Sequence, residues 1–358
     1  MRKTPTIRDV ARVAGVSIAT VSRVINGTGP VAADRAEAVR AAMAEIGFRP
    51  NAIGRQLKTS SSRTIGILVP SLFNPVFADS VQGCQEAAGA AGYATLLAAT
   101  DYDPGRERSA VEALLANRVE GLVLTVADAA ENETLDMLDA EGVPYVLVYN
   151  QPDEGGRPAV TIDNRRAMAD LVRYLIGLGH QRFAMIAGSF TASDRSRLRF
   201  EGFADALREA ALPPGLLLEV RFDDTEMAPL LAGLFSGRPA PTALVCTTDL
   251  LALAAIRSCR ALGLAVPRDL TVTGFDGIAL SALTSPSLTS LVQPSHAMGQ
   301  QAVGHLLGRL GTGATPRQVI LPHQIRPGES AAAPPSVRRA DVIPLRPTAP
   351  IAIKGETS

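Results

Sequence analysis

The chain has 358 residues, which is more than one hydrophobic core usually organises, so at least two folding units are expected. Its composition, with 46% apolar and 20% charged residues, excludes a chain that is disordered throughout. The net charge is zero, but residues 1–63 hold 11 basic and 4 acidic residues, so the positive charge that attracts nucleic acid is concentrated at one end.

The first predicted elements are two short helices within residues 7–26, where apolar residues recur at helical spacing on both sides of Gly15. Thr6 can cap the first helix, with Asp9 three residues later completing a capping box, and Ser17 can cap the second. Gly15 supplies the positive φ that a tight turn between the helices requires. The pattern predicts a helix-turn-helix.

A third helix is predicted over residues 33–46, with Gly47 able to end it in a left-handed conformation. Three helices then share one small core. The alternative is a helical hairpin that serves only for packing, but the turn glycine and the basic surroundings together favour DNA binding.

The string Ser17-Ile-Ala-Thr-Val-Ser-Arg-Val24, followed by Asn26-Gly27 and by Arg49-Pro50-Asn51, strongly resembles the lactose/galactose repressor family. In that family the second helix enters the major groove of DNA. The resemblance places Ile18, Ala19, Ser22 and Arg23 at base-facing positions. Arg23 can pair bidentately with a guanine. The side chains suited to phosphates, which fix the register without reading sequence, are Thr6, Ser17, Thr20 and Asn26.

Residues 51–58 resemble the family's hinge helix, which folds on the operator and wedges a leucine into the minor groove. The hinge residues expected to contact DNA are Asn51, Arg55 and the wedging Leu57. Gly54 stands where the family usually has alanine, and a glycine costs a helix interior about 1 kcal/mol, so folding of the hinge without DNA is expected to be unfavourable. The alternative is a plain linker.

From Thr64 onward, apolar strand-like runs alternate with amphipathic helices, which is typical of parallel sheets built from βαβ units. Three of the predicted helices are followed by glycines that can end them. The predicted strands are residues 65–70, 93–98, 121–125 and 144–148 in a first lobe, and 183–187, 243–246 and 270–275 in a second; the helices are 77–91, 165–178 and 250–262, followed by Gly92, Gly179 and Gly263.

This region resembles the periplasmic-sugar-binding-protein-like core of the same repressors, in which the chain crosses between two Rossmann-like lobes three times. The crossings are expected near Asp163, Gln293 and Pro322. The predicted fold class is therefore α/β, with an N-terminal all-α module. The predicted units are a DNA-binding domain (1–50), a hinge and linker (51–63), a bilobed effector-binding and dimerisation domain (64–330; lobe 1 about 64–162 and 294–321, lobe 2 about 163–293 and 322–330) and a tail (331–358).

Ligands of parallel sheets bind at the carboxyl ends of strands, and in a bilobed protein these ends face each other across a cleft. Pocket residues can therefore be nominated by position. Asp101 follows the second strand, and both it and Asn74 can instead cap a helix or turn. The residues nominated after the first strand, in a segment close to the family's pattern, are Ser71, Phe73, Asn74 and Phe77.

Arg199, three residues before Gly202-Phe203, matches the family arginine that grips the effector, and Asp276 matches its acidic partner. A charged hydrogen bond is directional and roughly twice as strong as a neutral one, which suits recognition of hydroxyls. The alternative is a salt bridge between lobes. Thr248 and Gln293 complete the nominated site.

Tyr149 stands where many sugar-responsive relatives have an acidic residue. A sugar, a sugar acid or an aromatic metabolite can stack on its ring, so the effector's identity stays open.

The segment after Glu329 contains five prolines, which prevent a continuous helix, so we expect a disordered tail. It also lacks the leucine heptads of a tetramerising helical bundle, so we expect a homodimer rather than a tetramer. We expect no metal or cofactor, because the cysteines and histidines lack ligand spacing. The prolines are Pro334, Pro335, Pro344, Pro347 and Pro350; the cysteines are Cys84, Cys246 and Cys259.

Two rival functions fit the sequence less well. A transport-type binding protein leaves the helix-turn-helix unexplained and requires an export signal that the sequence does not show. An enzyme on a Rossmann-like fold is not supported, because Gly177-Leu-Gly179 ends a helix and no other phosphate-binding or nucleophile motif occurs.

The sequence therefore predicts a transcriptional regulator, most simply a repressor of a catabolic or transport operon. We expect it to bind a palindromic operator as a dimer under the control of a sugar-like effector in the cleft between the lobes. No apolar run reaches the roughly 18 residues that a membrane span requires, so a cytoplasmic, nucleoid-associated protein without membrane contact is expected.

Overall fold

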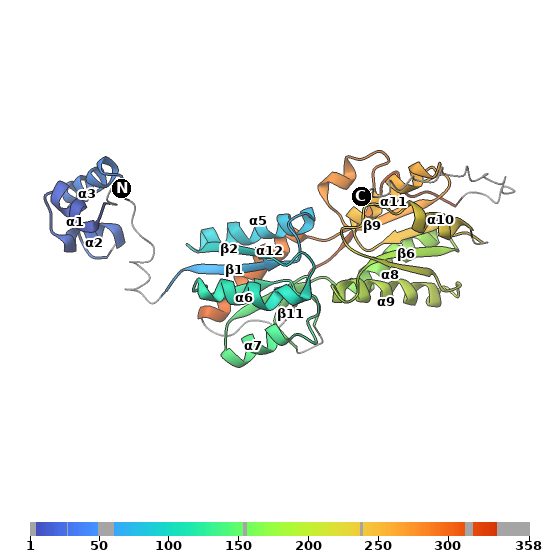
Figure 1. Ribbon diagram of the computed structural model, residues 1–358, viewed down its shortest axis with the longest axis horizontal. Helices are drawn as coiled ribbons and strands as arrows, with labels where there is room; N and C mark the ends of the chain where they lie inside the picture. The colour runs from blue at the N-terminus through green and yellow to red at the C-terminus, as the bar shows by residue number, and fades with distance from the viewer. Residues whose placement is uncertain are drawn as a thin grey trace, which may run out of the picture.

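The computed structural model describes residues 5–26, 28–48, 61–152, 156–236, 239–311 and 318–334. Within them, three N-terminal helices are followed by two α/β lobes (Figure 1). The predicted fold class is confirmed. None of the helices in these ranges is long and apolar enough to cross a membrane.

The N-terminal unit consists of α1 (Ile7–Val13), α2 (Ile18–Asn26) and α3 (Ala33–Glu45). The predicted caps are confirmed. The Asp9 carboxylate accepts hydrogen bonds from the Thr6 backbone N–H (2.9 Å) and hydroxyl (2.8 Å), and the Ser17 hydroxyl accepts one from the Thr20 N–H (3.1 Å). Gly15 has a φ of +64°, as the turn requires. The three helices share a small core of Val10, Ala11, Val21, Val39 and Ala42.

The first lobe is a six-stranded parallel sheet in the order β11-β5-β4-β3-β1-β2. Its strands are β1 (Thr64–Val69), β2 (Ala94–Ala99), β3 (Gly121–Leu124), β4 (Tyr145–Val148), β5 (Ala159–Thr161) and β11 (Gln318–Ile320). Its helices are α5 (Pro75–Ala90), the 3-10 helix η1 (Pro104–Arg106), α6 (Glu107–Ala116), α7 (Glu133–Glu141) and α12 (Ser295–Gly311).

The second lobe repeats this plan in the order β12-β10-β9-β8-β6-β7, with β12 antiparallel to β10. Its strands are β6 (Phe183–Gly188), β7 (Leu216–Val220), β8 (Ala243–Cys246), β9 (Thr271–Asp276), β10 (Thr289–Val292) and β12 (Gln324–Arg326). Its helices are α8 (Asn164–Gly177), α9 (Asp194–Glu209), α10 (Ala228–Ser236), α11 (Asp249–Ala261) and the 3-10 helix η2 (Ala279–Ala282).

The chain passes between the two sheets three times: from β5 to α8, from β10 to α12, and from β11 to β12. The carboxyl ends of the parallel strands in each lobe therefore meet at the junction between the lobes (Figure 1). The glycines after α5, α8 and α11 have positive φ angles, as the predicted helix ends require.

The folded body continues past residue 330, where the sequence predicted an irregular tail to begin. The Ala332 N–H donates to the Thr271 hydroxyl (3.1 Å), and the Ser330 carbonyl accepts from the Val272 N–H (3.0 Å). These bonds attach the segment to the start of β9 in the second lobe, so the expectation of disorder directly after residue 330 was wrong. Residues 335–358, which carry the rest of the predicted tail, lie outside the described ranges.

Candidate DNA-binding face and effector cleft

One face of α2 is exposed while the other packs against α1 and α3. Val21 is fully buried in the shared core, whereas Ser17, Ala19 and Arg23 are exposed and Ile18 is 46% exposed. A half-exposed isoleucine beside an exposed arginine is an arrangement that can contact base edges and thymine methyl groups.

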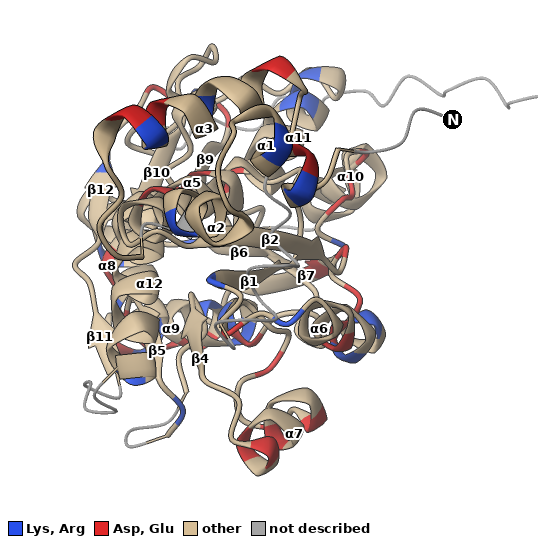
Figure 2. Cartoon of the chain, turned by 90° about the vertical axis from the view of Figure 1, so that its left-hand side faces the viewer, with Lys and Arg blue, Asp and Glu red and all other residues tan. Residues whose placement is uncertain are grey.

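Basic residues occur on each of the three helices, with acidic residues also on α1 and α3 (Figure 2). The hydroxyls of Ser17 and Thr20 lie 2.9 Å apart at the start of α2, where a helix N-terminus favours a phosphate. Ser22 is half-buried. Four nominated DNA contacts fall outside the described structure: the side chain of Asn26, and Asn51, Arg55 and Leu57.

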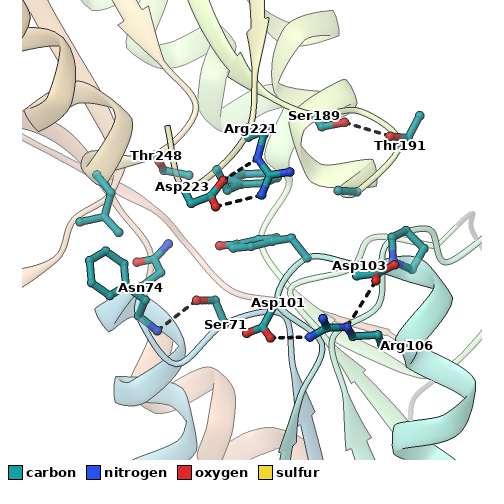
Figure 3. Close-up of a pocket in the computed structure, with 16 residues that line it drawn as sticks. Ser71, Asn74, Asp101, Asp103, Arg106, Ser189, Thr191, Arg221, Asp223 and Thr248 are labelled. Carbon is teal, nitrogen blue, oxygen red and sulfur yellow. Dashed lines mark hydrogen bonds and ion pairs between the residues drawn. The ribbon is translucent and has the colours of Figure 1, made fainter. Parts of the chain in front are cut away.

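A cleft of about 680 Å³ lies between the lobes, at the carboxyl ends of their strands (Figure 3). Phe73 is 79% exposed at this cleft, whereas Ser71 is buried and its hydroxyl accepts from the Phe73 N–H (3.0 Å). The nominated residues at the cleft are Ser71, Phe73, Asn74, Asp101 and Thr248.

The outer part of the cleft is lined by ion pairs that satisfy one another. Arg106 lies 2.7 Å from Asp101 and 3.4 Å from Asp103, and Arg221 lies 2.9 Å from Asp223 (Figure 3). All five side chains are more than half exposed, so each pair contributes little to stability. The alternative role of Asp101 as a helix cap is not seen, because Asp103 caps η1.

Behind the cleft lies a recess of about 20 Å³, which is room for about one water molecule. The rings of Tyr102 from the first lobe and Phe222 from the second stack at 4.1 Å between centroids and border both spaces. The other residues of the recess are Asn74, Val76, Phe77, Tyr149, Ser193, Arg195, Arg199, Thr248, Asp276 and Gln293.

Arg199 and Asp276 face each other in this recess, with 3.6 Å between Nη1 and Oδ1. Both belong to the second lobe, so the alternative of a salt bridge between lobes was wrong. The Arg199 guanidinium lies 3.6 Å over the Phe275 ring and donates to the Thr247 carbonyl (2.6 Å). Burial lowers the pKa of Arg199 to about 10 and raises the pKa of Asp276. The arginine therefore stays charged at neutral pH.

The Asp276 carboxylate is held from both lobes. It accepts from Gln293 Nε2 (2.8 Å) and from Asn74 Nδ2 (3.2 Å), which comes from the first lobe. Asn74 also caps α5 by accepting from the Val76 N–H (3.2 Å). Capping and lining the site are therefore compatible for Asn74. Thr248 likewise lines the recess while its hydroxyl caps α11.

Tyr149 has a different position from the one that stacking requires. It is only 2% exposed, its ring packs edge-on against Phe77, and its hydroxyl donates to the Val76 carbonyl (2.8 Å). A ring enclosed in this way has no free face for a ligand. The idea of stacking on Tyr149 is therefore wrong, and the rings that border the cleft are those of Phe73, Tyr102 and Phe222.

Two polar atoms in the recess are buried without a hydrogen-bond partner among the described residues: Arg195 Nη2, a donor, and Gln293 Oε1, an acceptor. Buried polar groups in proteins are almost always paired, so such atoms mark a place for another molecule. Sequence reasoning missed Arg195, Tyr102 and Phe222. Arg195 lies in the same arginine-rich turn as Arg199, which is a signal that could have drawn attention to it.

Two family models match the chain. The model described as "Bacterial regulatory proteins, lacI family" matches residues 6–51, and the one described as "Periplasmic binding protein-like domain" matches residues 172–331. The chain is 33% identical to the HTH-type transcriptional repressor PurR of Haemophilus influenzae (strain PittEE) over 307 residues, covering 85% of this chain and 91% of the relative. It is 32% identical to Catabolite control protein A of Priestia megaterium over 323 residues, covering 89% and 97%.

Solved structures are similar over most of the chain. The Lac repressor dimer bound to operator and the anti-inducer ONPF matches with a TM-score of 0.82 and 28% identity, covering 92% of this chain and 100% of that one. The transcriptional regulator CelR in complex with cellobiose matches with a TM-score of 0.67 and 30% identity, covering 91% and 100%.

Proposed function

Because this chain belongs to the LacI family of bacterial regulatory proteins, and is thus a DNA-binding transcriptional regulator and not an enzyme, we propose that it represses a catabolic or transport operon. It binds a palindromic operator as a homodimer, and a small-molecule effector in the cleft between the lobes controls that binding. In this proposal residues 1–50 bind DNA, residues 51–63 form the hinge, and residues 64–330 bind the effector and the second subunit.

The observation that carries the DNA-binding part is the exposed face of α2. Arg23 is exposed at the last turn of the helix, and Ile18 and Ala19 are exposed at its first turn. Arginine can make two parallel hydrogen bonds to a guanine in the major groove, which contributes about 1–3 kcal/mol of discrimination. The hinge contacts, which we assign to Asn51, Arg55 and Leu57, bend the operator at its centre.

Exposed apolar side chains support dimerisation. In the first lobe Leu96 and Leu97 of the edge strand β2 are 37% and 40% exposed, and in the second lobe Leu280 and Leu283, in and next to η2, are 53% and 82% exposed. Large apolar side chains on a sheet edge favour association with another chain. The structure of the similar Lac repressor is a dimer on its operator.

The recess supports an effector that carries hydroxyl groups. Arg195 Nη2 needs an acceptor and Gln293 Oε1 needs a donor, and a hydroxyl provides both. A carboxylate provides acceptors alone and lies unfavourably beside the Gln293 oxygen and the Asp276 carboxylate. With room for about one water molecule, the recess takes a single hydroxyl, and the rest of the effector lies in the adjoining cleft of about 680 Å³. A sugar or another polyol provides such a hydroxyl, and the similar regulator CelR was solved with cellobiose.

The proposal is tested by selecting genomic DNA fragments that the purified full-length chain binds, followed by footprinting of the selected fragments. We expect one inverted repeat protected by a dimer, with affinity that falls steeply as salt rises because phosphate counterions are released. Arg40→Ala, which removes an exposed charge of α3 that does not share the hollow lined by Ser17, Thr20 and Arg35, is the matched control for Arg23→Ala. Full-affinity binding to an isolated half-site, or a flat salt response, contradicts the proposal.

A further inference from the structure

The start of α9 inserts into the first lobe and joins the two lobes through buried polar contacts. The Asp194 carboxylate accepts from the Ala129 N–H (3.1 Å) and from Asn150 Nδ2 (2.8 Å), both in the first lobe. The Asp194 N–H donates to the Ala127 carbonyl (2.7 Å). Because Asp194 is only 4% exposed, these bonds are shielded from water and are stronger than surface contacts.

Arg195 extends this contact with one edge of its guanidinium. Its Nη1 donates to the Val126 carbonyl of the first lobe (2.8 Å) and to Asp194 Oδ1 (3.0 Å). The other terminal nitrogen, Nη2, is buried without a partner among the described residues and belongs to the lining of the effector recess. The side chain as a whole is 4% exposed. One planar, rigid group therefore touches both the lobe contact and the recess.

We propose that Arg195 couples effector binding to closure of the lobes. This role of Arg195 rests on the effector cleft of the proposed function. It is distinct from the role of Arg199, whose partners Asn164, Thr247 and Asp276 all lie in the second lobe. A hydroxyl that accepts from Nη2 fixes the guanidinium plane. Fixing that plane holds Nη1 on the Val126 carbonyl. The effector therefore has a higher affinity for the closed arrangement, in which Asp194 and Arg195 contact the first lobe, and stabilises that arrangement.

Arg197 provides a matched control on the same helix. It also reaches the first lobe, where its Nη2 donates to Asp128 (2.9 Å), but its side chain is 46% exposed and does not line the recess. An exposed pair of this kind contributes little. Arg197→Ala therefore removes one contact between the lobes without touching the recess.

The experiment measures the distance between spin labels on Ala113→Cys in α6 and Ala204→Cys in α9, both at exposed positions, in the full-length chain. The native cysteines are buried and do not take up the label. We expect Arg195→Met to reduce the ratio of closed to open chains roughly tenfold or more, as loss of one buried charged hydrogen bond implies. We expect Arg197→Ala to change it a few-fold at most. Because Arg195→Met leaves Asp194 without its cation, Arg195→Lys is measured as well; it keeps the charge and loses the planar pair of donors.

The probes are ribose, cellobiose, gluconate and adenine at millimolar concentration, with the same distance measurement. We expect ribose or cellobiose to increase the closed population of the wild-type chain and of Arg197→Ala, and to require roughly tenfold or more compound in Arg195→Lys. Equal closure of Arg195→Lys and wild type, or a wild-type chain that none of the four compounds closes, overturns the inference. Selection of genomic fragments on the same preparations tests the proposed function separately. If the chain binds an operator but the compounds close Arg195→Lys as readily as wild type, the coupling is refuted and the proposed function stands.

Discussion

Replacing Asp249 with asparagine should change how the stability of the protein depends on pH. Asp249 is fully buried at the start of α11, where its carboxylate accepts from the Ser281 hydroxyl and the Ile278 N–H, both at 2.8 Å, and from the Ser290 hydroxyl. These bonds hold the loop that follows Asp276. Burial, and then the nearby charge of Asp276, raise the pKa of Asp249 to about 7.

The direction of the pH effect follows from this shift. The folded chain keeps a proton on Asp249 between its ordinary pKa of 3.8 and about 7, whereas the unfolded chain has released it. The contribution to the free energy of unfolding is therefore fully present below the unfolded pKa and is lost as pH rises through the folded pKa. Raising the pKa from 3.8 to about 7 corresponds to about 4 kcal/mol, of which about 3 kcal/mol is lost between about pH 5 and about pH 8.

Asparagine can satisfy the same partners without charge. Its oxygen accepts from Ile278 and Ser281 while its amide donates to Ser290. Relative to wild type, Asp249→Asn should therefore gain about 3 kcal/mol of unfolding free energy as pH rises from about 5 to about 8, measured by urea unfolding followed by circular dichroism. Asp223→Asn, at an exposed position of the cleft, is the control and should leave the pH profile unchanged. A difference between Asp249→Asn and wild type that stays constant over this range refutes the reasoning.

Three other substitutions separate DNA binding, sensing and folding. Arg23→Ala should lose about 1–3 kcal/mol of discrimination per operator half-site in competition assays while its melting temperature stays that of wild type; retained sequence preference would exclude Arg23 from base reading. Asp276→Asn should bind operator as wild type does but lose roughly tenfold or more in effector affinity by calorimetry, and unchanged affinity would move the site elsewhere. Gly83→Ala should destabilise the first lobe by about 1–3 kcal/mol, because the added Cβ lies 2.1 Å from the His296 carbonyl where α5 crosses α12. Gly89→Ala on the same helix meets no atom within 4 Å and should be neutral or stabilising; equal behaviour of the two glycine variants would contradict the close crossing.

Local signals in the sequence were sufficient to place most of the elements. The capping pair Thr6 and Asp9 marked the start of α1, and the glycines at 92, 179 and 263 marked helix ends, because such residues act on backbone groups next to them in the chain. The short strands β5, β7, β10, β11 and β12 were not predicted. Several of these have three or four residues, so they carry too little periodicity to be recognised.

Contacts between the lobes could not be predicted, because they join residues far apart in the chain. Asn74 reads equally well as a helix cap and as a pocket residue, and its bond to Asp276 becomes visible only when the two lobes are placed together. The burial of Tyr149 has the same cause. Tyr149 follows β4, which is a position expected of a residue that binds the effector. However, α5 lies beside it, and its hydroxyl donates a hydrogen bond to the Val76 carbonyl.

The strand β2 has an apolar sequence that its exposed position in a single chain does not explain. Its sequence, Ala-Thr-Leu-Leu-Ala-Ala from residue 94 to 99, is almost entirely apolar on both faces, which is typical of a parallel strand covered on both sides. In the chain it lies at the edge of the first sheet, and Leu96 and Leu97 remain more than one third exposed. An edge strand that stays in water is normally protected by charges or proline, and β2 has neither. The pattern therefore fits a strand that is covered by another subunit, as in the homodimer that we propose.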